Sequence, residues 1–258
     1  MPRVKLVLEY DGTNYVGWQI QPNGPSVQGR VQKALAELLG EPVQVMAAGR
    51  TDSGVHARGQ VIAFDSPRQL PMKAYWMGLN GVLPDDISVV RAEEVRPDFD
   101  PRRWSEGKRY RYLVSNRRTR SPLRRLTHWE IFQPLAIEPM REAAKSLLGK
   151  HDFTSFRGAE CQAKTAVREL RAIEVTGVVG DELSLTFEGT AFLRHMVRNL
   201  VGTLMEVGRT RQPVAWVGEV LAARDRNKAG PTAPAQGLCL EEVFYGAGPR
   251  DGSDEHDD

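Results

Sequence analysis

Apolar and polar residues alternate at the start of the chain, where the apolar side chains occupy positions 4, 6, 8 and 10. A period of two residues is typical of a half-buried strand, and the Asp11-Gly12 pair that follows predicts a turn. The spacing then becomes helical: Ser26 is a suitable N-cap, apolar residues recur at 27, 31, 35 and 38, and Gly40 predicts the C-terminus. The chain is therefore expected to begin with a strand over residues 4–10, a turn and an amphipathic helix.

The same two periods continue to the end of the chain. They predict strands over residues 43–47, 60–64, 87–95, 108–116, 168–175, 182–187 and 238–245, and helices over 71–79, 138–148, 192–207 and 214–223. The first round of elements has the β-α-β-β-α-β order of a ferredoxin-like unit. A similar order roughly recurs after the stretch 96–105, whose two prolines are typical of a linker. We therefore expect an α+β fold of two ferredoxin-like or RRM-like domains with antiparallel sheets.

The predicted domains are residues 1–104 and residues 105–247, followed by a disordered acidic tail at 248–258. A length of 258 residues suffices for two domains, and 41% hydrophobic residues can form an ordinary core. No apolar run approaches the roughly 20 residues of a membrane span, and the first residues lack the apolar stretch of a signal peptide. We therefore expect a cytoplasmic protein without membrane attachment.

Charge is unevenly distributed along the chain, although the formal net charge is only +2. The last eight residues hold five acids and no Lys or Arg, whereas residues 102–125 hold ten basic side chains and one acid. Nine of these ten are arginine, which suits bidentate contacts with phosphate, and two tyrosines lie among them. A solvated basic face is the ordinary interpretation of a short basic run. This composition nevertheless favours a nucleic acid as the partner.

Metal and nucleotide sites find no support in the sequence. The two cysteines, Cys161 and Cys239, lie far apart without metal-binding spacing, and the five histidines form no HExxH pair. Neither GxxxxGK[ST] nor a GxGxxG motif after a strand occurs. We therefore expect free thiols and no metal requirement.

The densest group of reactive side chains is the segment 48–57, between two predicted strands. It carries Arg50, Asp52 and His56 together with two hydroxyl side chains, and glycines flank them. Polar loops on a rigid sheet often hold catalytic groups, but Asp, Ser and Gly are equally the residues of a plain hairpin connection. The residue pattern by itself leaves both interpretations open.

The segment GRTDSGVHARGQV at 49–61 resembles the signature loop of the tRNA pseudouridine synthase A family. Four further blocks resemble that family in the same order: DGTNYVGWQ at 11–19, KRYRY at 108–112, DFTSFR at 152–157 and HMVRNLVG at 195–202. The resemblance covers about residues 3–246, and five ordered blocks are highly specific. It implies a cofactor-free isomerisation of uridine to pseudouridine in tRNA, with the catalytic cleft between the two domains.

The resemblance also implies roles for individual residues. Asp52 matches the catalytic aspartate, which acts as the nucleophile either on ribose C1′ or on C6 of the base. Arg198 matches an arginine that pairs with this aspartate, and such a cation offsets the cost of burying an ionised carboxylate. Tyr110 matches the tyrosine that stacks on the target base, and its hydroxyl is a candidate for removing the C5 proton. Arg50 matches an arginine implicated in base extrusion.

The basic stretch adds Arg109, Arg117 and Arg118 as expected contacts to the RNA, and the resemblance implies a homodimer that receives the anticodon stem-loop. Two other functions explain parts of the sequence. An RNA-binding module without activity accounts for the arginines but not for an acid in the glycine loop. A carboxylate-based hydrolase requires a second carboxylate, which the loop lacks. We therefore expect a tRNA isomerase. The sequence predicts neither which uridines it prefers nor what its acidic tail does.

Overall fold

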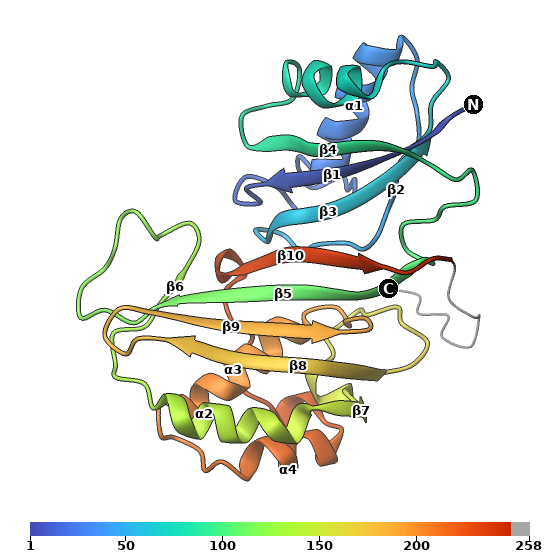
Figure 1. Ribbon diagram of the computed structural model, residues 1–258. Coiled ribbons are helices and arrows are strands. Elements are labelled where there is room, and N and C mark those ends of the chain that lie inside the picture. Colours follow the sequence, from blue (N-terminus) through green and yellow to red (C-terminus); the bar gives the residue numbers. More distant parts are fainter. Residues whose placement is uncertain (249–258) are drawn as a thin grey trace. The chain divides into compact units, whose positions relative to one another are not determined.

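The structure, a computed structural model, describes residues 1–248 (Figure 1). Two compact units form: residues 1–106 with the described part of 240–254, and residues 107–239. Each unit combines a mainly antiparallel sheet with helices, so the predicted α+β class is confirmed. Nearly all of the tail predicted at 248–258 lies outside the described residues. Within the described part, no helix has the length and apolar character that crossing a membrane requires.

The first unit contains β1 (Arg3–Tyr10), α1 (Val27–Leu39), β2 (Met46–Ala47), β3 (His56–Asp65), the π-helical turn η1 (Ala74–Gly78), β4 (Ile87–Val95) and most of β10 (Leu238–Tyr245). Its strands lie in the order β4-β1-β3-β10, and β2 pairs with β3. β1 runs antiparallel to both of its neighbours. This is the predicted β-α-β-β-α-β order, with the second strand reduced to two residues.

Helix α1 begins and ends as its sequence predicts. The N–H of Gly29 donates to Oγ of Ser26 at 3.2 Å, and Gly40 ends the helix in the left-handed conformation with φ of 80°. The apolar residues Val27, Val31 and Leu35 are at most 1% exposed. Burying one such side chain stabilises the fold by about 1.5–3 kcal/mol, so this face fixes the helix on the unit.

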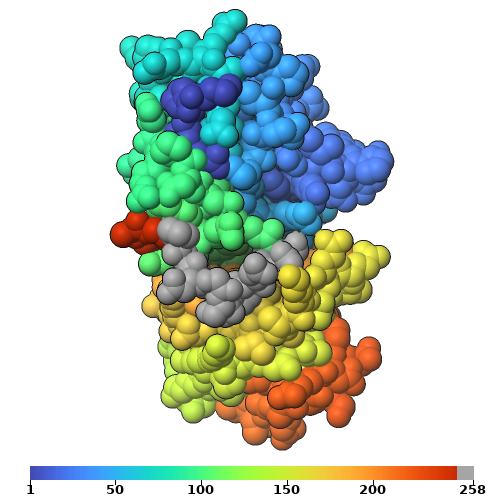
Figure 2. Space-filling view, turned by 90° about the vertical axis from the view of Figure 1, so that its right-hand side faces the viewer, coloured from blue at the N-terminus to red at the C-terminus, as the bar shows by residue number. Residues whose placement is uncertain are grey.

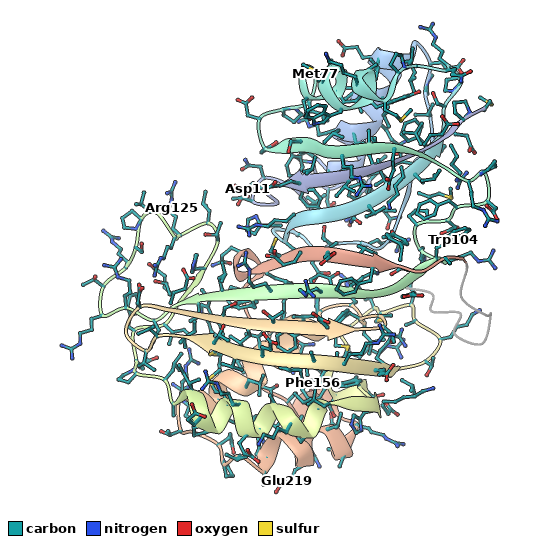
Figure 3. All side chains as sticks on the ribbon, in the orientation of Figure 1. Asp11, Met77, Trp104, Arg125, Phe156 and Glu219 are labelled. Atoms are coloured by element: carbon teal, nitrogen blue, oxygen red, sulfur yellow. The ribbon has the colours of Figure 1, made fainter. Side chains whose placement is uncertain are left out.

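The second unit contains β5 (Ser105–Ser115), β6 (Trp129–Glu130), α2 (Ile137–Ala144), η2 (Lys145–Leu147), β7 (Gly149–Asp152), η3 (Thr154–Phe156), β8 (Val167–Gly177), β9 (Glu182–Gly189), α3 (Met196–Gly208), α4 (Trp216–Ala223), η4 (Arg226–Lys228) and η5 (Ala235–Gly237). The strand order is β5-β9-β8-β7, antiparallel throughout, and β6 joins β5 in parallel. Helices α2, α3 and α4 gather on one side of this sheet (Figure 1). Phe156, labelled in Figure 3, is fully buried in η3, which contacts α3 and α4.

Several elements differ in length from the sequence expectation, and three of the differences concern the segments around the candidate site. α3 begins at Met196 instead of 192, because His195 has φ of 60°, a left-handed conformation through which a right-handed helix cannot run. β3 begins at His56, within the segment expected to be a loop. Most of β10 lies with the first unit and not with the second. It pairs there with β3, and Arg58 of β3 forms an ion pair with Glu241 of β10 at 3.7 Å.

Candidate functional site

The loop predicted to carry the chemistry is a tight turn between β2 and β3 of the first unit. The N–H of Val55 donates to the carbonyl of Asp52 at 3.1 Å, and Gly54 has φ of 77°, a conformation that glycine adopts without steric cost. Asp52 is half-buried at the first corner of this turn. The strand that follows at once, β3, gives the turn a rigid base.

The block at 11–19 holds the turn from the other side. The N–H of Trp18 donates to the carbonyl of Thr51 at 3.0 Å, and the N–H of Gly54 donates to the carbonyl of Tyr15 at 3.3 Å. Gly17 has φ of 109°, and a Cβ on it would lie 2.6 Å from the Thr51 carbonyl oxygen. The two backbones are therefore in direct contact. Beyond this block the chain is exposed, and Figure 2 shows the blue segment standing out from the surface of the unit.

A buried histidine joins the same block to β3. The N–H of Gly12 donates to Nδ1 of His56 at 3.1 Å, and Oδ1 of Asp11 lies 3.1 Å from the same nitrogen. Asp11 is labelled in Figure 3 at the turn after β1. Burial alone would raise the pKa of Asp11, but hydrogen bonds from Thr13 and the proximity of His56 outweigh that effect and lower it. His56 thus supports the architecture behind the turn.

The start of the loop depends on a side chain that sequence analysis missed. Gln60 is fully buried on β3, and its Nε2 donates to the carbonyl of Gly49 at 2.8 Å. In the sequence, the available signal is an uncharged polar residue directly before the apolar residues 61–64, because such a side chain needs a hydrogen-bond partner when the strand is buried. Arg50, the next residue after Gly49, is exposed.

Tyr110 and Tyr112 lie on one face of β5 in the second unit. Tyr110 is 8% exposed, is paired across the sheet with Phe187 and packs edge-on against Phe192, with ring centroids 5.0 Å apart. Tyr112 is fully buried, and its hydroxyl donates to the carbonyl of Pro234 at 2.8 Å. Tyr112 therefore belongs to the core, whereas the side chain of Tyr110 keeps a small exposed area.

Arg198 lies in the first turn of α3, close to Tyr112. Its Nε donates to the carbonyl of Ala233 at 2.8 Å, and the N–H of Ala233 donates to the carbonyl of Arg198 at 3.1 Å. Burial raises the pKa of Tyr112, and the nearby Arg198 cation partly opposes that rise. The second unit thus places a guanidinium near the tyrosine strand β5.

Some arginines of the basic stretch 102–125 are paired with acidic side chains, whereas others are exposed on a loop. Arg109 lies opposite Glu188 on β9, and its Nε is 2.6 Å from a Glu188 carboxylate oxygen, so its charge is partly balanced within the protein. Arg124 likewise forms an ion pair with Asp181 at 2.8 Å. A larger group, exposed on the loop between β5 and β6, comprises Arg117, Arg118, Arg120 and Arg125. Figure 3 labels Arg125 on this loop.

The exposed loop is anchored at its base. Nε2 of His128 lies 2.9 Å from Oε2 of Glu182, and the N–H of Ser121 donates to Oε1 of Glu130 at 2.6 Å. Nδ2 of the buried Asn116 donates to the carbonyl of Ile131 at 2.9 Å. These contacts hold both ends of the loop that carries the exposed arginines.

The candidate site residues are therefore distributed over both units: Arg50 and Asp52 lie in the first, and Arg109, Tyr110, Arg117, Arg118 and Arg198 lie in the second. Across residues 1–248, no group of three or more His, Cys, Asp or Glu side chains is arranged to hold a metal ion. Within these residues, neither Cys161 nor Cys239 takes part in a disulfide.

Comparison with known proteins adds an independent finding. Residues 6–102 and 143–246 match the family model described as tRNA pseudouridine synthase. A Myxococcus xanthus protein named tRNA pseudouridine synthase A is 68% identical over 249 residues, which are 96% of this chain and 94% of that protein. A protein of the same name from Geobacter sulfurreducens is 51% identical over 245 residues, 95% of this chain and 100% of that protein. Among solved structures, the archaeal box H/ACA sRNP Nop10-Cbf5 complex matches with a TM-score of 0.38 and 10% identity, over 95% of this chain and 49% of the matched chain.

Proposed function

Because this chain belongs to the tRNA pseudouridine synthase family, we propose that Asp52 is the nucleophile with which it isomerises uridine to pseudouridine in tRNA. The observation that carries the proposal is the construction of the Asp52 turn. Its backbone is held by Tyr15 and Trp18 on one side and by β3 on the other. A nucleophile fixed in this way needs little reorganisation before it reacts.

The reaction that Asp52 serves is balanced within the nucleotide. The bond between N1 of uracil and C1′ of ribose breaks, the base turns, and a bond forms between C5 and C1′. C5 then loses its proton, and N1 carries one in the product. An ionised carboxylate is the required nucleophile whether it attacks C1′ or C6, and it is regenerated in both cases.

Arg198 and Tyr110 are proposed to complete the catalytic group from the second unit. The guanidinium of Arg198 favours the ionised form of Asp52 when the two pair, and its Nε is already oriented by Ala233. The ring of Tyr110, supported edge-on by Phe192, offers a flat surface on which the target base stacks.

The remaining contacts are proposed to bind and deform the RNA. Arg50 is exposed beside the Asp52 turn, and a guanidinium there offsets part of the cost of extruding a stacked base, about a few kcal/mol. Arg117 and Arg118 are exposed and suited to phosphates, whereas the contribution of Arg109 is reduced by Glu188. By family resemblance we further propose a cytoplasmic homodimer that acts on the anticodon stem-loop.

The test is the release of tritium from C5-tritiated uridine in a tRNA transcript, measured with metal chelated. We expect Asp52→Asn to bind tRNA normally and to lose turnover, because an amide is not a nucleophile of this kind. Ser53→Ala in the same turn is the matched control: it removes a hydroxyl that donates to the carbonyl of Tyr15 at 3.2 Å but leaves Asp52 and the backbone bonds of the turn, so we expect it to retain turnover. An Asp52→Asn variant with turnover within tenfold of wild type would remove Asp52 from the mechanism, and no release by the wild type would favour an RNA-binding module.

A further inference from the structure

Residues 230–237 of the second unit, called the strap here, form hydrogen bonds with both Arg198 and Tyr112. The carbonyl of Ala233 accepts from Nε of Arg198 at 2.8 Å, and its N–H donates to the backbone carbonyl of the same arginine at 3.1 Å. The next carbonyl, that of Pro234, accepts from the hydroxyl of Tyr112 at 2.8 Å. The strap therefore provides the acceptor that orients the Arg198 side chain.

The strap backbone is packed directly against its supports. A Cβ on Gly202 of α3 would lie 1.6 Å from the Pro231 carbonyl oxygen, and a Cβ on Gly237 would lie 2.5 Å from Cζ of Tyr112. Such distances leave no space for a side chain at either glycine. The helix and the strap meet backbone to backbone, so a displacement of the strap is transmitted to the residues that it touches.

A set of polar side chains fixes the start of the strap. Asn199 is fully buried, and its Oδ1 accepts from Oγ1 of Thr232 at 2.6 Å and from Nη2 of Arg226 at 3.0 Å. Nη2 of Arg226 also donates to Oγ1 of Thr232 at 2.9 Å, and its Nη1 donates to the carbonyl of Gly230 at 2.9 Å. Nδ2 of Asn199 donates to the carbonyl of Phe156 at 2.8 Å. These three side chains thus connect α3, η4 and the strap.

We propose that Asn199, Arg226 and Thr232 are positioning residues that hold the Arg198 guanidinium in place through the strap. Asn199 directly follows Arg198 on α3, and Thr232 directly precedes Ala233 on the strap, so the network fixes the two chain segments whose contact orients Arg198. An arginine side chain has many rotamers, and the fixed acceptor at Ala233 reduces that freedom. The inference rests on the proposed pairing of Arg198 with Asp52.

Loss of this network should act on the rate and not on substrate binding. A misplacement of a catalytic group by 1 Å can cost about a hundredfold in rate. We therefore expect Thr232→Val, which keeps the shape and removes the hydroxyl, to lower kcat at least about tenfold with KM within about twofold of wild type. Thr232→Ser restores the hydroxyl and should restore kcat. Arg226→Lys keeps the charge without the fork of donors and should resemble Thr232→Val.

A purely structural role predicts a different set of results. Ser155→Ala is the matched control, because this buried hydroxyl donates to the carbonyl of Val220 at 2.6 Å and accepts from the N–H of Asp225 at 2.8 Å, and neither partner belongs to the strap. We expect Ser155→Ala to lower Tm and to leave kcat unchanged. A Thr232→Val variant and an Arg226→Lys variant that lower Tm but keep the wild-type kcat would overturn the inference.

A double-mutant cycle with Arg198→Lys separates this inference from the proposed function. Lysine has no Nε–H to donate to Ala233, so Thr232→Val should reduce kcat by less than about twofold in that background. Full additivity of the two changes would overturn the inference alone. Wild-type turnover by Arg198→Lys itself would overturn the proposed role of Arg198, and the inference with it.

Discussion

Gly17 tests whether the position of the Asp52 turn controls the reaction. Its φ of 109° is a backbone conformation that residues other than glycine rarely adopt. A Cβ at this position would lie 2.6 Å from the Thr51 carbonyl oxygen, 3.1 Å from the carbonyl carbon of Asp52 and 3.2 Å from the backbone nitrogen of Ser53. All three atoms belong to the backbone of the turn. Gly17→Ala must therefore displace the turn, the Gly17 segment or both, because no flexible side chain can give way.

The size of the effect follows from these distances. Ordinary van der Waals contact of a Cβ begins at 3.4 Å, so the turn and the Gly17 segment must separate by roughly 0.8 Å in all, and a displacement near 1 Å can cost about a hundredfold in rate. We expect kcat to fall by about 10- to 100-fold. The left-handed φ adds a strain of about 1–3 kcal/mol, which corresponds to a decrease in Tm of several degrees.

The assay compares Gly17→Ala with Gly180→Ala, both measured for tritium release at saturating tRNA and for Tm. Gly180 also has a positive φ, 88°, but a Cβ on it would have no atom of the described residues within 4 Å beyond its immediate chain neighbours. The control therefore imposes a similar backbone strain without a collision, and we expect it to lower Tm and to retain kcat. If Gly17→Ala kept a kcat within twofold of that of Gly180→Ala, the position of the turn would not control the rate.

Three further predictions concern binding and stability. Tyr110→Phe should keep tRNA affinity while Tyr110→Ala loses about 1–3 kcal/mol of base stacking, and equal, near-wild-type turnover by both would exclude an active-site role. Replacing Arg117, Arg118 and Arg120 together by glutamine should flatten the salt dependence of binding by roughly 0.9 for each phosphate that is no longer neutralised, and should raise KM with little change in kcat; an unchanged slope would place the RNA elsewhere. Hydrogen bonds from Thr154 and the charge of Arg224 lower the pKa of Asp152, so Asp152→Asn should reduce Tm at neutral pH, and the reduction should shrink as the pH falls below the ordinary carboxyl value of 3.8. A decrease in Tm that is the same at every pH would contradict this.

A count of basic residues in the sequence does not show which of them are paired with acids in the folded protein. Ten basic residues in the stretch 102–125 predicted a nucleic acid partner, and the family assignment agrees with tRNA as that partner. The sequence did not indicate that Arg109 is paired with Glu188 or that Arg124 is paired with Asp181. These acids lie far away along the chain, and the pairing of β5 with β9 brings Glu188 opposite Arg109.

Local sequence determined most of the secondary structure and the family. The cap at Ser26 and the stop at Gly40 act within a few residues, so α1 was predictable, and β10 occupies the predicted residues 238–245. The five family blocks, three of which contain Asp52, Tyr110 and Arg198, are short and follow one another in a fixed order, so they could be recognised without coordinates.

Tertiary structure alone decided how those blocks are supported. Gly17 contacts Thr51, Gln60 holds Gly49, and Thr232 reaches Asn199, and the two members of each pair lie well apart in the sequence. Hydrophobic periodicity reports which face of an element is buried, but it contains no term for such long-range hydrogen bonds and backbone contacts. The candidate nucleophile could therefore be identified from the sequence, whereas the contacts that fix it and its proposed partner arise only when the chain is folded.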